Sequence, residues 1–419
     1  MKERLIWCCL LAVAVVILLL GGSFGERCLP QPIQPIALGD YRAPGGGGGV
    51  VVPSSGSSSI PGAALPTSPS SGPPSISGAA LPTSYVCSPE EAAAQATHFD
   101  FRQSSCPGHS WWPRFVEALA CQSLTIVLIG ANKGYGVAAF LDFFAPELAT
   151  TPASLYKRLH ARYGDSVGGL CGMCEDCKVA HVGRRVSREC TLPSGERMGA
   201  AAAFPIELHA LEPLPANFEM ITFGLGSVGG GAGAGVRLHL HQAAAVGDPA
   251  LTSVPFMVCS PGEEGCGVVL EGSSDAAWAH APKERRGALQ NVTATTVDAF
   301  ASRLAAPVID VLTVDAEGLD PDVLVGAEGL LRSQRVRLLE FEYNWQRSWE
   351  KTTLQSVVEK LDGFGYDCFL MQHQFLLRAT GCWVPAYEFK NWGNVMCLSR
   401  KETVLAAALN HFLWGLQGK

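Results

Sequence analysis

The chain has 419 residues, of which 47% are hydrophobic and 16% are charged, so it is long enough to bury a sizeable core. Its formal net charge is −7, whereas general nucleic-acid-binding proteins are more often basic with a clustered positive patch. The composition therefore argues against a nucleic-acid partner.

The N-terminus carries a membrane-directed signal. Lys2 and Arg4 precede an unbroken apolar run from Leu5 to Leu20, whose length lies between a signal-peptide core and a full membrane span. We expect residues 1–25 to form a signal anchor that attaches the protein to a membrane. The alternative is a signal peptide cleaved after Gly25, where small residues suit cleavage.

Residues 26–90 form a tract rich in Gly, Pro, Ser and Ala, in which Ser59–Ser68 recurs almost unchanged as Ser75–Ser84. Such a composition cannot bury enough apolar surface to offset the entropy of ordering, so we expect a disordered stem. An anchor followed by a stem and a folded domain is typical of a single-pass type II enzyme of the Golgi or another secretory-pathway membrane. Low-complexity padding and a secreted protein are the alternatives.

A strand, a glycine-containing turn and a helix are predicted in succession over Thr125–Phe140. Gly130 and Gly134 stand where the chain must turn sharply, and where a bare backbone can approach a ligand. The helix that follows offers unpaired N–H groups. This arrangement is typical of nucleotide-cofactor sites, although plain α/β scaffolding also uses it. The candidate cofactor-binding residues of the turn are Gly130, Ala131, Asn132, Gly134 and Tyr135.

Further apolar segments predict the remaining strands of a doubly wound, mostly parallel α/β sheet of the Rossmann-like type. They are Ile206–Glu212, Val236–Asp248, Val308–Gly318 and Val336–Asn344. Acidic residues end several of them, and the carboxyl ends of successive parallel strands meet at one crevice. A single strand-end acid is more often a turn or helix cap, but their repetition in order favours a site.

The chain resembles the FkbM family of S-adenosylmethionine-dependent methyltransferases from about Thr125 to Arg400. The resemblance is carried by LIGANKGYG, HALEPLPANF, AAAVGD, VTATTVDAF, VDAEGLDPDVLVGAEGLL and LEFEY. It implies a class I methyltransferase domain over residues 91–400, followed by a C-terminal helix at 401–419. It also implies S-adenosylmethionine as cofactor and an O-methyltransferase that acts on a hydroxyl of a glycan or another small hydroxylated acceptor.

The resemblance also suggests roles for individual residues. Asp315 is the candidate general base or acceptor-positioning group, and Glu317 is expected beside it, with capping of the next helix as its alternative role. His241 is a further catalytic candidate on the third strand. Glu212 is expected to bind the ribose diol and Asp248 the adenine amino group.

Two positions depart from the family pattern. Leu128 stands where the family usually has aspartate, and Thr313 stands where it usually has lysine. The first change removes a carboxylate expected near the methionine end of the cofactor. A methyltransferase fold retained as an inactive binding module therefore stays an alternative. A type II glycosyltransferase is a weaker one, since Asp320 and Asp322 form a DxD that has a good explanation as helix capping.

The 15 cysteines include a dense cluster within residues 145–203, a segment longer than the connection between the first two strands requires. The segment is therefore predicted to be an insertion. The cluster consists of Cys171, Cys174, Cys177 and Cys190. Disulfides are expected in an oxidising compartment, with a zinc site or unpaired thiols as alternatives. The identity of the acceptor and the oligomeric state cannot be inferred from the sequence.

Overall fold

The computed structural model describes residues 85–106, 111–164, 174, 189–191, 197–199, 204–228, 235–269, 289–304 and 306–414. All of them lie in one compact unit, Gly72–Lys419. The expected anchor and nearly all of the expected stem lie outside the described residues. In the described part of the chain, no helix combines the length and the apolar character needed to cross a membrane.

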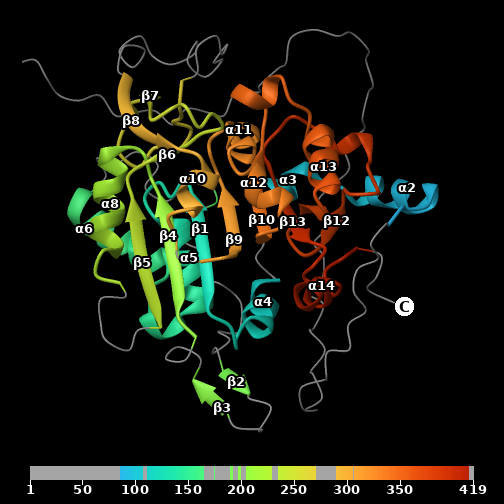
Figure 1. Ribbon diagram of the computed structural model, residues 1–419, viewed down its shortest axis with the longest axis horizontal. Helices are drawn as coiled ribbons and strands as arrows, with labels where there is room; N and C mark the ends of the chain where they lie inside the picture. Colours follow the sequence, from blue (N-terminus) through green and yellow to red (C-terminus); the bar gives the residue numbers. More distant parts are fainter. Residues whose placement is uncertain are drawn as a thin grey trace, which may run out of the picture. The chain divides into compact units, whose positions relative to one another are not determined.

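An eight-stranded mixed sheet forms the centre of this unit (Figure 1). In spatial order its strands are β12 (Leu376–Arg378), β11 (Tyr366–Met371), β13 (Gly393–Ser399), β10 (Val336–Tyr343), β9 (Ile309–Val314), β1 (Leu124–Ile129), β4 (Ile206–Leu211) and β5 (Val236–His241). The strands from β10 to β5 are parallel, whereas β13 runs antiparallel to both β10 and β11. The expected α/β architecture with a mostly parallel sheet is confirmed.

The strand order reverses direction at β1. The chain proceeds from β1 to β4 and β5 on one side, then returns to place β9 and β10 on the other side. The point between β1 and β9 is a topological switch point, outside which ligands bind in open α/β sheets.

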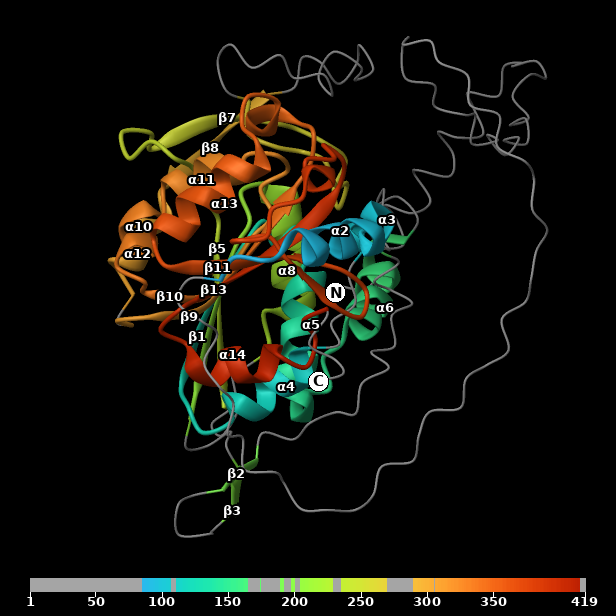
Figure 2. The same ribbon diagram turned by 90° about the vertical axis from the view of Figure 1, so that its right-hand side faces the viewer.

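Helices cover both faces of the sheet, as the view in Figure 2 shows. One face carries α4 (Trp112–Ala118), α5 (Tyr135–Phe144), α6 (Pro152–Tyr163) and α8 (Pro215–Leu225), with α14 (Thr403–Leu409) packed on α4. The other carries α10 (Val297–Ala301), α11 (Asp320–Val325), α12 (Glu328–Arg332) and α13 (Leu354–Gly363). Alternate residues of β1 enter the two cores, so the whole strand is buried. A sheet covered on both faces explains why its strands are continuous apolar runs.

Two short helices, α2 (Pro89–His98) and α3 (Phe101–Ser105), precede this core. A capping box formed by Ser88 and Glu91 fixes the start of α2. The Cys87–Cys382 disulfide ties the segment before α2 to the loop after β12. The boundary expected at residue 90 therefore falls inside a helix.

Two segments differ from the elements expected. The strand expected over Val236–Asp248 is divided, because β5 ends at His241 and β6 (Ala244–Ala245) joins a separate sheet with β8 (Leu289–Thr295) and β7 (Ser253–Met257). Within the expected insertion at 145–203, the structure has η1 (Pro146–Leu148), α6 and a hairpin of β2 (Glu189–Thr191) and β3 (Arg197–Gly199). Helix α6 packs against α5 and α8, so this part of the segment belongs to the helical layer. Two further 3-10 helices are η3 (Arg347–Glu350) and η4 (Pro385–Tyr387).

Candidate active site

The turn after β1 lies at the switch point and has the backbone that the sequence predicts. Gly130 has φ 81° and Gly134 has φ 99°, both in the left-handed region that favours glycine. A Cβ at Gly130 would lie 1.8 Å from the carbonyl oxygen of Asp315, and one at Gly134 would lie 2.9 Å from Cγ1 of Ile221. The expected reason for these glycines was the approach of a ligand. The structure gives a different reason, because protein atoms occupy both places.

Glu212 joins the end of β4 to this turn. One carboxylate oxygen accepts a hydrogen bond from the backbone N–H of Asn132 at 2.7 Å, and the other accepts one from Leu214 at 2.9 Å. The residue is 4% exposed, and burial raises the pKa of its carboxyl to about 8. Glu212 therefore positions the β1 turn as well as lining the site.

Four acidic residues meet near the ends of β9 and β10, namely Asp315, Glu317, Asp320 and Glu342. The Asp315 side chain is open to the cavity, and the enclosing protein, together with the charge of Asp320, raises its pKa to about 7. Asp320 is fully buried and accepts hydrogen bonds from the backbone of Gly318 at 3.2 Å and of Glu342 at 3.3 Å. The pKa of Glu342 is raised well above its usual value by burial and then by Asp315. Mutual repulsion among these carboxyls keeps part of the group protonated near neutral pH.

Glu317 does not cap the next helix, so that alternative role is wrong. The N-cap of α11 is Leu319, which makes no side-chain cap bond. Glu317 instead has φ 53°, and its carboxylate accepts a hydrogen bond from the backbone N–H of Gly265 at 2.8 Å. Burial and the Asp315 charge raise the pKa of Glu317 to about 7. The strand expected over Val308–Gly318 is shorter, because β9 ends at Val314 and both Asp315 and Glu317 follow it.

A loop closed by the Cys259–Cys266 disulfide lies against the site, and the sequence reasoning missed it. The buried ammonium of Lys133 donates to Glu264 at 2.7 Å and to the Gly262 carbonyl at 2.9 Å. The N–H of Gly262 donates to Asn217 on α8 at 2.8 Å. The short spacing of the two cysteines, with glycines between them, is the signal that could have revealed this loop.

A cavity of about 880 Å³ brings these groups together. The expected site residues that line it are Gly130, Ala131, Asn132, Tyr135, Glu212, Asp315 and Glu317. Glu340 and Glu342 of β10 line it as well, and so do Met371, Trp392 and Asn394 at its far end. The cavity therefore opens at the carboxyl ends of strands on both sides of the switch point.

Three expected residues are not among those that line this cavity. Gly134 begins α5 behind the turn. His241 stacks with His209 and with the edge of Phe300, and its Nε2 lies 3.1 Å from Nδ1 of His209. Asp248 is exposed and accepts a hydrogen bond from the backbone of Ala250 at 2.8 Å. The division of the expected third strand places the last two outside the site.

Comparison with known families agrees with this geometry. Residues 181–368 match the model of the methyltransferase FkbM domain. No curated protein and no solved structure matched the chain. The match includes β4, β5, β9 and β10 with Glu212, Asp315 and Glu317, whereas β1 and its glycine turn lie before it.

The two departures from the FkbM pattern are neighbours in the sheet. Leu128 of β1 pairs with Thr313 of β9, and Thr313 pairs with Glu340 of β10. All three residues line the cavity. The positions at which the resemblance leads one to expect aspartate and lysine thus lie side by side, and both are uncharged here.

Neither the alternative of a zinc site nor that of a glycosyltransferase gains support from the described residues. Cys174 forms a disulfide with Cys106 at the cavity wall, while the side chains of Cys171, Cys177 and Cys190 lie outside the described residues. Asp322 of the DxD accepts a hydrogen bond from the Ser348 hydroxyl. Among the described residues, no group of three or more His, Cys, Asp or Glu side chains is arranged to hold a metal ion.

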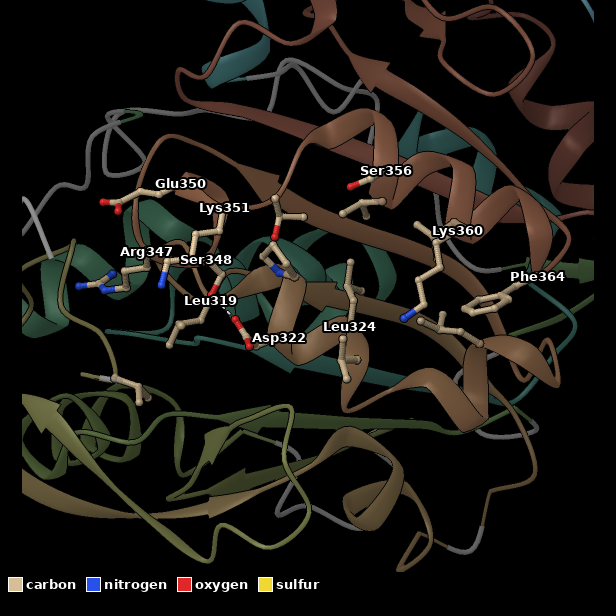
Figure 3. Close-up of a pocket in the computed structure, with 17 residues that line it drawn as sticks. Leu319, Asp322, Leu324, Arg347, Ser348, Glu350, Lys351, Ser356, Lys360 and Phe364 are labelled. Atoms are coloured by element: carbon tan, nitrogen blue, oxygen red, sulfur yellow. Dashed lines mark hydrogen bonds between the residues drawn. The ribbon is translucent and has the colours of Figure 1, made fainter. Parts of the chain in front are cut away.

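A second cavity, of about 510 Å³, lies between α11 and α13 (Figure 3). Leu324 and Asp322 line it from α11, and Lys360 lines it from α13. The ammonium of Lys360 pairs with Glu328 at 2.6 Å. None of the strand-end acids Glu212, Asp315 and Glu317 lines this cavity, so the first cavity is the candidate active site.

Proposed function

We propose that the protein is an S-adenosylmethionine-dependent O-methyltransferase that acts on a hydroxyl of a glycan or another hydroxylated acceptor. The FkbM domain supports the methyltransferase class. The observation that carries the proposal is the cavity at the switch point, where the Gly130 turn, Glu212 and Asp315 meet.

The residues present fit such a cofactor. The volume of about 880 Å³ is within the range of small-molecule sites. Glu212 accepts a backbone N–H at each oxygen, interacts with the Asn217 side chain, and lines the cavity where ribose hydroxyls would bind. The buried Oδ1 of Asn132, in the turn after β1, has no hydrogen-bond partner in the protein, as expected of a group that serves a ligand.

S-adenosylmethionine, when bound, supplies a methyl group on a positively charged sulfur. Transfer of this methyl group to an acceptor oxygen would require the hydroxyl proton to leave. Asp315 is open to the cavity and has a pKa of about 7, so it exists as a carboxylate in a useful fraction at neutral pH and can accept that proton. Most of the remaining rate enhancement is expected from positioning within the cavity.

The test is Asp315→Asn, which keeps the size of the side chain and removes the base. We expect methyl transfer to fall by roughly 10² to 10⁴, with the calorimetric affinity for S-adenosylhomocysteine little changed. Asp248→Asn is the matched control, because Asp248 is exposed and outside the cavity. Full turnover by Asp315→Asn would remove it from the mechanism. Failure of the unmutated protein to bind either form of the cofactor would refute the proposed function, and binding without turnover on a broad acceptor panel would favour an inactive binding module.

We further propose that the enzyme works in the secretory pathway as a single-pass type II membrane protein of the Golgi or a neighbouring membrane. The disulfides Cys87–Cys382, Cys106–Cys174, Cys259–Cys266 and Cys368–Cys397 support an oxidising compartment. Asn291 heads an Asn-Val-Thr sequon and is exposed on β8. A glycosidase-sensitive mass on Asn291 checks the location, whereas reduced cysteines together with an unmodified Asn291 would contradict it.

A further inference from the structure

We propose that the acceptor carries a positively charged amino group beside its hydroxyls, and that Glu340 of β10 binds this group. The inference rests on the proposed methyltransferase function and narrows the class of its substrate. Amino sugars and similar hydroxylated amines are the compounds that fit.

The charge of the cavity is one-sided. The carboxyl groups that line it are Glu212, Glu263, Glu264, Asp315, Glu317, Glu340 and Glu342. Among the described lining residues, Lys133 is the one lysine, His373 is the one histidine and there is no arginine. The Lys133 ammonium is already paired with Glu264 at 2.7 Å. A cationic acceptor is therefore favoured over an anionic one, because a cation draws these carboxyl groups toward their charged form in a site partly screened from water.

Among these carboxyl groups, Glu340 has the fewest polar or charged partners in the protein. Its cross-strand neighbours are Thr313 on β9 and Met396 on β13, neither of which is charged. Its buried Oε1 has no hydrogen-bond partner in the protein. Burial alone raises the pKa of Glu340 to about 8. Glu340 as a whole is half-buried, but a buried carboxyl oxygen without a partner is costly in a folded protein, so its position on a cavity wall is best explained by a ligand.

Glu342 provides a second observation that points to a bound ammonium group. It is 8% exposed, lines the same cavity, and its Oε2 also lacks a partner. Glu340 and Glu342 are two residues apart on β10, so they share a face of the sheet. The two side chains together offer acceptor atoms to an ammonium group, which has three N–H donors.

The strand order assigns this pair to the acceptor and not to the cofactor. The Gly130 turn and Glu212 belong to β1 and β4, whereas β10 lies beyond β9 on the other side of the switch point. Neighbouring strands are about 4.8 Å apart, so β10 is on the order of 10 Å from β1. From β10 the cavity continues to Met371 and Trp392, which provides room for a second molecule.

Binding is expected to be linked to a proton. Below pH of about 8 the Glu340 carboxyl in the empty cavity is mostly protonated, whereas a bound ammonium favours the carboxylate. The proton is therefore released on binding. The affinity for an amine that stays protonated should rise between pH 6 and 8.

The experiment uses the full chain saturated with S-adenosylhomocysteine and three probes that share one ring. They are glucosamine, N-acetylglucosamine and glucuronate, which are cationic, neutral and anionic. We expect calorimetry to show binding of glucosamine, much weaker binding of N-acetylglucosamine and none of glucuronate. Glu340→Gln should lower the glucosamine affinity by roughly 10- to 100-fold, the range of one hydrogen bond to a charged group, and should abolish the rise in affinity between pH 6 and 7, where the glucosamine amine stays mostly protonated.

A second pair of variants keeps the test independent of the effect of Glu340→Gln on folding. Thr313→Lys places a tethered ammonium next to Glu340 and should prevent glucosamine binding, whereas Thr313→Met, of similar bulk and without charge, should reduce it less. Equal binding of the three probes, or binding of none, overturns the inference while leaving the proposed function intact if S-adenosylhomocysteine still binds. A loss of S-adenosylhomocysteine affinity in Glu340→Gln would show that Glu340 binds the amino group of the cofactor, and would also overturn it.

Discussion

Gly130→Ala is expected to destabilise the domain because two strands meet at this residue. Alanine at φ 81° costs about 1–2 kcal/mol, since an L side chain is unfavourable in the left-handed region. Its methyl group would lie 1.8 Å from the Asp315 carbonyl oxygen, so the β1 turn and the end of β9 must move apart by about 1 Å or more. That movement strains the hydrogen bond from Asp315 N–H to the Ile129 carbonyl, now 3.1 Å, and loss of the bond costs about 0.5–1.5 kcal/mol.

The combined cost is roughly 1.5–3.5 kcal/mol, which corresponds to a fall in the thermal midpoint of about 3–14 °C for a large domain. Circular dichroism melting of the full chain measures it. Gly136→Ala is the matched control, because a Cβ there has nothing within 4 Å and the residue lies in α5. A midpoint for Gly130→Ala within about 1 °C of the unmutated protein would refute the packing argument. Because Asp315 moves with the turn, methyl transfer should fall as well.

Two further predictions concern buried charge. Leu128→Asp places a carboxylate at a residue that is 4% exposed, so it should lower the free energy of unfolding. Thr313→Lys in the same chain should restore part of this loss, because the two positions pair across β1 and β9. Equal destabilisation of the single and double variants in chemical denaturation would argue against a charge pair between these positions. The second prediction concerns Glu212, whose pKa is about 8 in the folded state against an ordinary value of 4.5. The stability that its carboxyl contributes is therefore complete below pH 4.5 and is lost as the pH rises toward 8. The loss is at most about 1.4 kcal/mol per pH unit. Glu212→Gln should flatten that slope between pH 5.5 and 7.5 while Asp248→Asn leaves it unchanged, and an unaltered slope in Glu212→Gln would contradict the assignment.

Local patterns were sufficient to predict most of the sheet. The apolar runs that become β1, β4, β9 and β10 are continuous because both faces of the sheet are covered, and such runs can be read without knowing their partners. The strand-end positions of Glu212 and Asp315 followed directly from those runs, and the structure places both on one cavity.

Long-range features could not be predicted in this way. His241 and Asp248 were assigned to one strand end, but the chain leaves the main sheet after His241 to form β6. The contact of Lys133 with Glu264 joins residues far apart in the sequence, and the residues around Lys133 do not predict it. The relation of Leu128 to Glu340 depends on the order of three strands, which hydrophobic patterns do not encode.

The Cys87–Cys382 disulfide determines how a tethered enzyme would carry mechanical load. A pull on the chain from its N-terminal side reaches Cys87 first and passes through the covalent bond to the loop after β12, so helix α2 is bypassed. Strand β12 is at the edge of the sheet, and β11, β13, β10 and β9 separate it from β1. A load on the N-terminal side would therefore be applied at the edge of the sheet opposite β4 and β5, away from the strands that hold Gly130 and Glu212.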